Sequence, residues 1–382
     1  MNVITTTDAL AAFVRAARTA PYVAVDTEFM REKTYWPILC LVQAAAPGVE
    51  AVIDPLAEGI DVSPLADLLG DEAVVKVFHA ARQDVEIFFA LFGAVPKPMF
   101  DTQIAAMAAG FGDQIGYEPL VRGLLGAQID KGSRFTDWAR RPLSQAQLTY
   151  ALSDVTHLRD AYPLLTERLS KDGRNSWVDE EMQALSDPSL YRVEPEVAWQ
   201  RLKMRGVRQN EIGPIVKLAE WREQEAQARD VPRGRIIKDE SLFELARLKP
   251  KTAEDLARAR SLPTGFERSK SGQALLAAIA AGVAMPRSAL PQIDRDDNRA
   301  PAPPDVVDLL KVLLKNRCEK FGVAPRLVAS AADVEAIAVD DAAEVPALNG
   351  WRREVFGEDA LRLKRGEIAL KLSGGEVEIT EV

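Results

Sequence analysis

An acidic pair lies in the segment Val-Ala-Val-Asp-Thr-Glu-Phe, which supplies Asp26 and Glu28. A β-strand alternates its faces, so the two side chains project from one face about 6 to 7 Å apart. Like charges on one face of an apolar strand repel each other and are costly to desolvate, and a bound divalent cation removes that cost. The alternative is that the strand has ended and both acids face water.

A third acid, Asp84, follows an expected strand at 74–78 and falls in the first turn of an expected helix at 81–92. An acid in this position also suits the positive end of the helix dipole, which alone would explain it. A fourth acid, Asp154, lies four residues after Tyr150, so both side chains share one face of a long expected helix at 144–169. An isolated hydrogen bond between the tyrosine and the aspartate is the alternative for this pair.

Taken together, these residues resemble the DEDD superfamily of 3′→5′ exonucleases, whose motifs run D-x-E, then D, then Y-x-x-x-D. In the other branch of that superfamily a histidine lies five residues before the last aspartate, where this chain has Thr149, so the tyrosine branch is implied. The match extends over roughly residues 20–170 and resembles the ribonuclease D family in particular. It includes the segments Phe100-Asp101-Thr102, Thr136-Asp137-Trp138 and Arg141-Pro142-Leu143.

The resemblance implies a ribonuclease H-like fold and a mechanism that uses two divalent cations. By family analogy Asp26 bridges the cations, Glu28 and Asp154 complete the ligands of one, and Asp84 acts on the other through water. Tyr150 would orient the attacking water or help to remove its proton. The residue chemistry agrees, because four carboxylates are suitable hard ligands for Mg²⁺ or Mn²⁺.

Other polar residues near these motifs have two interpretations each. His79 is a candidate substrate contact or a hydrogen-bonded structural histidine, and His157 is equally open. Trp138 is a candidate for stacking on a base, or a core residue that positions the helix of Tyr150. Asp101 begins an expected helix and is interpreted as its N-cap, with a ligand role as the alternative. No P-loop or dinucleotide-binding glycine motif occurs, so we expect no nucleotide cofactor.

The elements that position these residues read as an α/β domain over 1–170, with a mixed sheet flanked by helices. Short β-branched runs predict strands, and longer segments with helical periodicity follow them. The expected strands lie at 22–25, 38–42, 51–53 and 74–78, and the expected helices at 81–92, 102–109, 118–125 and 144–169.

The rest of the chain is expected to be a connector at 171–204, a helical domain at 205–288, a proline-rich linker at 289–304 and a second helical domain at 305–382. The first helical domain resembles the HRDC domain, a small all-α module. The segments that match are Leu218-Ala-Glu-Trp221-Arg222-Glu, Ala228-Arg-Asp-Val-Pro232-Arg233, Ile236-Ile237-Lys-Asp239, Leu245-Ala246 and Pro250. The second resembles a divergent copy, because Arg326-Leu327-Val328 and Ile337-Ala338 repeat the pattern of Arg235-Ile236-Ile237 and Leu245-Ala246.

Charge is distributed unevenly along the 382 residues. Residues 1–170 hold 14 Lys and Arg against 21 Asp and Glu, whereas residues 201–270 hold 17 against 11. A basic module can attract phosphates non-specifically, and clustered carboxylates can bind cations. An uneven surface without function is the alternative. The segment 271–382 is acidic overall, which leaves open whether the second module binds nucleic acid.

Cellular context follows from simple absences in the sequence. No run approaches the length of a membrane span, and the N-terminus lacks the pattern of a secretory signal. Cys40 and Cys318 are the only two cysteines, which fits a reducing cytoplasm. We expect a monomer without a membrane partner, because three fused domains can surround one site.

The resemblance therefore implies a 3′→5′ exoribonuclease that hydrolyses RNA from a free 3′-OH and releases 5′-mononucleotides. It points to RNA with a single-stranded 3′ end, and to precursor tRNA as the substrate class. A DNA-directed exonuclease is one alternative, although no polymerase segment is present. A catalytically inactive RNA-binding scaffold is another, although all five active positions are intact.

Overall fold

A computed structural model describes residues 3–129, 132, 136–293 and 302–382 of the chain. It divides into two compact units. The first unit comprises Met1–Glu28, Leu39–Leu190 and Ala300–Val382, and the second comprises Phe29–Ile38 and Tyr191–Arg299. No helix in the described ranges combines the length and apolarity that crossing a bilayer would require.

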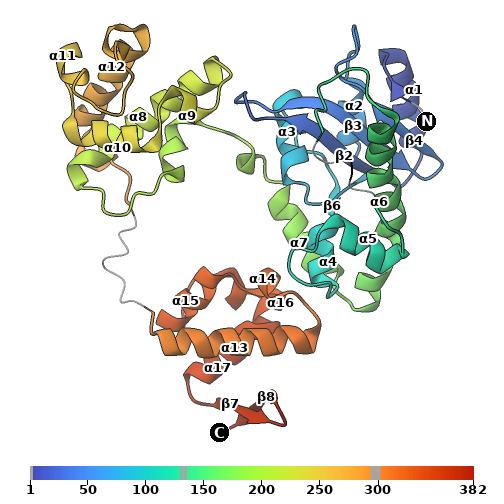
Figure 1. Cartoon of the computed structure of the whole chain (residues 1–382). Coiled ribbons are helices and arrows are strands. Elements are labelled where there is room, and N and C mark those ends of the chain that lie inside the picture. Colours follow the sequence, from blue (N-terminus) through green and yellow to red (C-terminus); the bar gives the residue numbers. More distant parts are fainter. Residues whose placement is uncertain (1–2, 130–131, 133–135, 294–301) are drawn as a thin grey trace. The chain divides into compact units, whose positions relative to one another are not determined.

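A six-stranded mixed sheet forms the centre of the first unit (Figure 1). The strands are β1 (Val3–Ile4), β2 (Tyr22–Met30), β3 (Ile38–Ala46), β4 (Val49–Ile53), β5 (Val75–Phe78) and β6 (Met99–Asp101). Their order across the sheet is β1-β4-β3-β2-β5-β6. The strand β2 pairs in parallel with β5, and β3 pairs antiparallel with β4. The strand with the acidic pair is therefore central, as an apolar run such as Val23–Val25 favours.

Helices surround this sheet, and the longest covers part of one face. They are α1 (Thr7–Ala17), α2 (Pro64–Leu69), α3 (Arg82–Phe92), α4 (Thr102–Ala108), α5 (Tyr117–Leu125), α6 (Gln145–Lys171) and α7 (Asn175–Leu185). A capping box at Ser144 starts α6, because its hydroxyl accepts from the Gln147 backbone and the Gln147 side chain reaches back. Val155 and Leu158 of α6 pack with Ala24, Ala45 and Val77 of three strands.

The predicted strands and helices of residues 1–170 are found, with four additions: the helices α1 and α2 and the edge strands β1 and β6. The short edge strands β1 and β6 have only two and three residues and carry no alternating pattern. The expected connector at 171–204 contains α7, whose Val178 and Met182 are buried. The exposed face of α7 is polar, so the sequence did not indicate that the opposite face packs in a hydrophobic core.

The C-terminal helical module belongs to the first unit and shares its hydrophobic core. Its elements are α13 (Pro304–Phe321), α14 (Pro325–Val328), α15 (Ala331–Val339), α16 (Gly350–Arg352), a π-helical turn (Arg353–Gly357), α17 (Glu358–Lys364), β7 (Ile368–Ser373) and β8 (Glu376–Glu381). One cluster of buried residues joins Ala105 of α4 and Val178 of α7 to Leu313 and Phe356 of the module. The hairpin β7–β8 departs from the expected all-α content, since Ile368–Ser373 alternates and is followed by Gly374-Gly375.

Backbone contacts fix this module tightly against α4. A Cβ atom added to Gly110 would lie 2.8 Å from the Gly322 carbonyl oxygen. The Arg174 guanidinium donates to the carbonyl oxygens of Ala108 and Gly322 at 2.6 and 2.9 Å, and the Ala324 backbone N–H donates to Met107 at 3.0 Å. Such close backbone approach requires glycine at the contact.

The second unit is a helical module with its own core. Its helices are α8 (Gln209–Ala228), α9 (Arg233–Ile236), α10 (Asp239–Leu248), α11 (Ala253–Leu256) and α12 (Lys270–Ala284). The helices α8 and α12 cross where Gly213 meets Gly282, because a Cβ on either would lie within 2.5 Å of the other's carbonyl oxygen. The succession of a long helix, a four-residue helix and a helix of nine or ten residues recurs at α13–α15. This recurrence supports the internal duplication.

The segment between β2 and β3 is part of this second unit. Tyr35 is 9% exposed and lies in the core of the module. Its hydroxyl donates to the buried Glu223 carboxylate, and it accepts from Arg233 at 3.1 Å. The Asp230 carboxylate accepts from the backbone N–H groups of Tyr35 and Trp36 at 3.0 Å each. The chain that leaves the acidic strand is therefore held by side chains of the module.

Domain boundaries predicted from the sequence remain predictions. Most of the expected linker at 289–304 lies outside the described residues, which omit 294–301. The division between units near Leu190 falls inside the expected connector.

Candidate active site

Three of the four predicted carboxylates come together at one point of the first unit. Asp26 and Glu28 project from β2, and Asp154 projects from α6. One oxygen of each carboxylate lies within 4.8 Å of an oxygen of the other two. Asp26 and Glu28 are two residues apart on one strand, and Asp154 lies on the helix that covers the sheet. The fold therefore brings together residues more than 120 positions apart in the sequence.

Asp84 lies beside this cluster at the start of α3 and is 7% exposed. Its carboxylate accepts a hydrogen bond from the Thr27 hydroxyl at 2.5 Å. Thr27 stands between the two acids of β2 in the sequence, so its hydrogen bond ties Asp84 to the strand that carries them. It fixes the fourth acid relative to the first two.

Burial and mutual repulsion disfavour the charged forms of these acids. Burial raises the pKa of Asp26 to about 6, partly offset by the backbone N–H of Thr27. Burial also raises the pKa of Asp84 well above its usual value, and the nearby Asp26 charge raises it further. Such crowding is unfavourable for a structural site and suits one that receives positive charge.

Tyr150 lies one turn before Asp154 and hydrogen-bonds to its carboxylate. Burial raises the pKa of Tyr150 above its usual value, and the charges of Asp154, Glu28 and Asp26 raise it further. The phenol therefore remains protonated beside the carboxylates. The Trp138 ring centroid lies 6.1 Å from that of Tyr150, and this packing limits the rotamers open to the Tyr150 side chain.

Trp138 is 3% exposed, so it lies within the core beside Tyr150. This burial fits the interpretation of a residue that positions the tyrosine helix. The Arg141 guanidinium holds the same loop, since it donates to the Trp138 carbonyl at 2.7 Å and pairs with Asp54 at 2.7 Å. Stacking of Trp138 on a base stays a prediction.

His79 is directed toward α4 and α5. Its Nδ1 lies 3.0 Å from the Thr102 hydroxyl, and its ring lies 5.4 Å from that of Tyr117. Burial lowers the pKa of His79, which favours the neutral ring. His157 bonds within its own helix, to the Ser153 carbonyl at 2.8 Å. These contacts fit structural roles, and the substrate contact of His79 stays a prediction.

Two supporting residues have roles that their spacing alone did not reveal. Asp101 caps α4 as predicted, accepting from Gln103 at 2.8 Å, and it also accepts from the backbone of Ala80 and Ala81 at 3.0 and 2.8 Å. It thereby fixes the turn that leads into Asp84. The Tyr117 hydroxyl donates to the Asp154 carbonyl and ties α5 to α6. Nothing in the sequence around Tyr117 signals this contact.

The donor set fits divalent cations of the Mg²⁺ class. It consists of carboxylate oxygens, which such cations prefer, and the three ligand atoms are close enough to share an ion. Burial raises the pKa of Asp26, and a bound cation would favour its charged form.

Comparisons with known proteins agree with this geometry. A family model described as a 3′→5′ exonuclease matches residues 1–170, and the HRDC domain model matches residues 215–279. The ribonuclease D of Granulibacter bethesdensis is 52% identical over 379 residues, which are 99% of this chain and 96% of that protein. The ribonuclease D of Acidiphilium cryptum is also 52% identical, over 99% of this chain and 97% of that protein.

The chain belongs to the ribonuclease D family. Among solved structures, Escherichia coli RNase D, an exoribonuclease involved in structured RNA processing, is 31% identical with a TM-score of 0.82. That match covers 96% of this chain and 99% of the other. The catalytic core of RRP6 from Trypanosoma brucei shares the fold at 23% identity and a TM-score of 0.55, over 76% of this chain.

Membership in the ribonuclease D family confirms the predicted ribonuclease H-like fold followed by a helical HRDC domain. It also confirms the predicted enzyme class, so the chain is a 3′→5′ exoribonuclease. The alternatives of a DNA-directed exonuclease and an inactive scaffold lose their support, because relatives across the full length are ribonucleases.

Proposed function

We propose that Asp26, Glu28, Asp84, Tyr150 and Asp154 form the active site, and that it removes 5′-mononucleotides from a free 3′-OH end with two divalent cations, Mg²⁺ or Mn²⁺. The observation that carries this proposal is the approach of the Asp26, Glu28 and Asp154 carboxylates within 4.8 Å. Bound there, divalent cations would offset the charge of the scissile phosphate and lower the pKa of an attacking water.

Each residue of the site has a separate task in this proposal. Asp26, Glu28 and Asp154 would hold the cations directly. Asp84, fixed by Thr27, would act through water on the second. Tyr150 carries its proton because its pKa is raised, so its hydroxyl can donate to one oxygen and orient a water near the phosphate. Removal of a proton by Tyr150 would require that the bound positive charge first lower its pKa.

The proposed substrate is RNA with a single-stranded 3′ end, with precursor tRNA as the substrate class. The similarity to Escherichia coli RNase D, whose role is structured RNA processing, supports this choice. We also propose that the protein works as a monomer in the cytoplasm. Cys40 and Cys318 are both buried and unbridged, which fits a reducing compartment.

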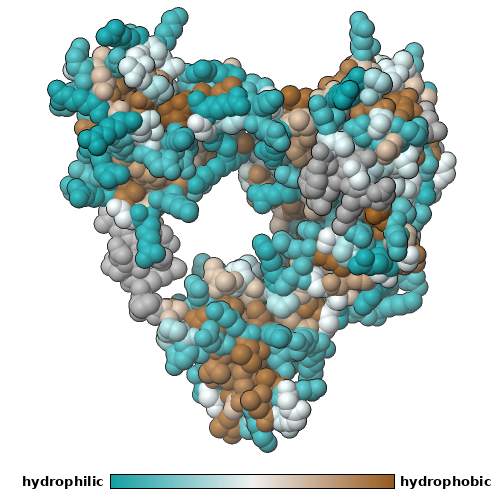
Figure 2. All heavy atoms as spheres, in the orientation of Figure 1, coloured by the Kyte–Doolittle hydropathy of each residue, from teal (hydrophilic) through white to brown (hydrophobic). Residues whose placement is uncertain are grey.

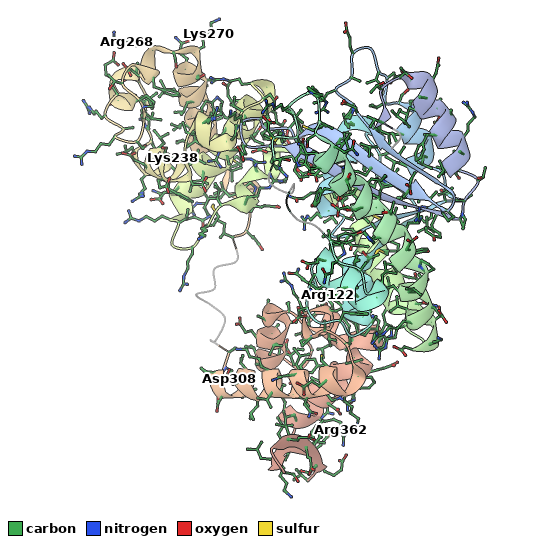
Figure 3. All side chains as sticks on the ribbon, turned by 45° about the vertical axis from the view of Figure 1, so that its right-hand side comes forward. Arg122, Lys238, Arg268, Lys270, Asp308 and Arg362 are labelled. Carbon is green, nitrogen blue, oxygen red and sulfur yellow. The ribbon has the colours of Figure 1, made fainter. Side chains whose placement is uncertain are left out.

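The second unit is proposed to hold the RNA backbone. Most basic side chains of its segment 201–270 are exposed. Figure 3 labels three of them, Lys238, Arg268 and Lys270, and Figure 2 shows hydrophilic residues over much of this module. Exposed basic groups on one module can contact successive phosphates without reading sequence.

The direct test is the release of mononucleotides from a 3′-labelled RNA by the full chain. We expect release in millimolar Mg²⁺ or Mn²⁺, none with excess chelator, and none by Asp154→Asn at any metal concentration. A matched control is Asp160→Asn, which changes an exposed acid of the same helix that pairs with Arg159. Release by Asp154→Asn at the wild-type rate would contradict the assignment.

A further inference from the structure

Gln43 is a buried polar residue that the proposed mechanism does not use. It lies in the middle of β3 and is 0% exposed. Neither its amide nitrogen nor its amide oxygen has a hydrogen-bond partner. A buried amide without partners costs about 1–3 kcal/mol for each polar group, and an apolar residue of the same size would avoid that cost. A polar group retained at such a cost calls for an explanation.

The register of the sheet shows which face Gln43 occupies. The β3–β4 ladder is regular and pairs Gln43 with Val52 and Ala45 with Glu50. Glu50 forms an ion pair with Arg159 of α6 at 3.0 Å, and Ala45 packs against Val155 of the same helix. Side chains two apart on a strand share a face. Gln43 therefore faces α6, the helix that carries Asp154.

The level of Gln43 along this face follows from the neighbouring strand. Ala24 of β2 packs in the same cluster as Ala45. The strands β2 and β3 are neighbours, and the seven residues between them are too few for a parallel crossover, so the strands run antiparallel. Two residues beyond Ala24 is Asp26, and two residues before Ala45 is Gln43. Asp26 and Gln43 therefore lie on the same face of adjacent strands, each displaced from the Ala24–Ala45 cluster toward the same end of the sheet.

We propose that Gln43 is a positioning residue for Asp26. In this structure the amide has no partner; with cations bound, a turn of the amide toward β2 would let its N–H donate to the Asp26 carboxylate. The amide is a neutral donor, so it fixes the orientation of the Asp26 carboxylate and leaves its negative charge for the cation. A lysine in that place would offset that charge. This inference rests on the proposed function, because it assigns Asp26 to cation binding.

The test is Mn²⁺ affinity of the full chain, measured by calorimetry, together with thermal melting in chelator. Gln43→Met has nearly the same size and removes both amide atoms. We expect it to melt higher than the wild type in chelator, because the unpartnered amide is gone. We expect its Mn²⁺ affinity to fall about 10- to 100-fold, as for other residues that orient metal ligands. The KM for RNA should stay unchanged, since Gln43 is buried.

Two further variants keep this test decisive. Val42→Ala changes the neighbouring residue that faces away from α6, and it should lower melting while Mn²⁺ affinity stays at the wild-type value. Gln43→Asn keeps the amide on a shorter side chain and should bind Mn²⁺ better than Gln43→Met does. It also provides the affinity reading if Gln43→Met fails to fold.

The outcomes separate this inference from the proposed function. Unchanged Mn²⁺ affinity in the folded Gln43 variants, beside a wild type that binds Mn²⁺, would overturn the role of Gln43 alone. A wild type that binds no Mn²⁺ and releases nucleotides in chelator would overturn the proposed function itself.

Discussion

The two helical modules have similar successions of helices but different relations to the catalytic unit. The module at 305–382 shares a hydrophobic core with α4 and α7, and Arg174 ties its backbone to α4. The module of the second unit has its own core, which includes Tyr35 from the segment after β2. The module at 305–382 holds 11 Lys and Arg against 15 Asp and Glu. Residues 201–270 of the second unit hold 17 Lys and Arg against 11 Asp and Glu. The two modules therefore differ in packing and in charge, and the proposed phosphate contacts belong to the second unit.

The largest difference should appear in stability. Leu313 and Leu245 are matched buried leucines, each 0% exposed, in α13 and α10. Each change to alanine should cost about 2–5 kcal/mol. Leu313→Ala should speed hydrogen exchange in peptides of α4, because the core is shared, whereas Leu245→Ala should speed exchange only within the second unit. Equal exchange of α4 peptides in both variants would refute the assignment of separate cores.

Asp26→Asn should stabilise the metal-free protein, and only in the first unit. The folded pKa of Asp26, about 6, exceeds its ordinary value of 3.8. The folded state therefore binds the proton more tightly, and its stability falls as pH rises from about 4 through 6. The variant escapes this loss, so its advantage should be absent near pH 4 and reach up to about 3 kcal/mol above pH 7. Melting in chelator across this range measures it.

If the advantage of Asp26→Asn is the same at pH 4 and pH 8, the burial of the Asp26 charge does not explain it. Saturating Mn²⁺ should reverse the order, because the wild type gains the binding energy of the ion.

Tyr150→Phe should lower kcat about 10- to 100-fold while KM and Mn²⁺ affinity change less than about twofold. The hydroxyl is assigned to water, and the carboxylates retain the cations. Steady-state kinetics and a Mn²⁺ titration measure the two effects separately. A main defect in Mn²⁺ affinity would show that Tyr150 has been given the wrong task.

Charge reversal in the helical module of the second unit should raise KM and leave kcat unchanged, in contrast to Tyr150→Phe. The triple variant Lys238→Glu, Arg268→Glu and Lys270→Glu changes exposed side chains. We expect KM to rise about tenfold and the salt slope of kcat/KM to flatten by about one for each phosphate that the module no longer binds. The matched control reverses Lys311, Lys315 and Lys320 in α13, all exposed. Equal effects of the two triple variants would remove the distinction between the modules.

A truncation near residue 200 is a poor substitute for these variants. It would remove α13–α17 and expose the core that they share with α4 and α7. The sequence did not reveal this, because the connector at 171–204 looked polar and the buried side of α7 was not recognised. Shared cores between segments far apart depend on tertiary packing, which a local pattern does not report.

The acidic motifs were predictable because their spacing has direct geometric meaning. Two residues on a strand, and four on a helix, share a face. The tasks of Thr27 and Tyr117 could not be predicted, since each depends on a contact with a residue at least 37 positions away. The face of the sheet on which Gln43 lies also could not be predicted, because its assignment depends on the β3–β4 register and the Glu50–Arg159 ion pair. The hairpin β7–β8 was missed although Ile368–Ser373 alternates, because the similarity to a helical module dominated the prediction.

The most direct test of the account is a crystal of the full chain soaked with Mn²⁺ and a short RNA, with anomalous scattering used to locate the metal. We predict Mn²⁺ peaks between the carboxylates of Asp26, Glu28 and Asp154, with the 3′ end of the RNA beside them. Peaks only at other sites, in crystals whose dissolved protein still releases nucleotides, would contradict the assignment of this cluster as the catalytic centre.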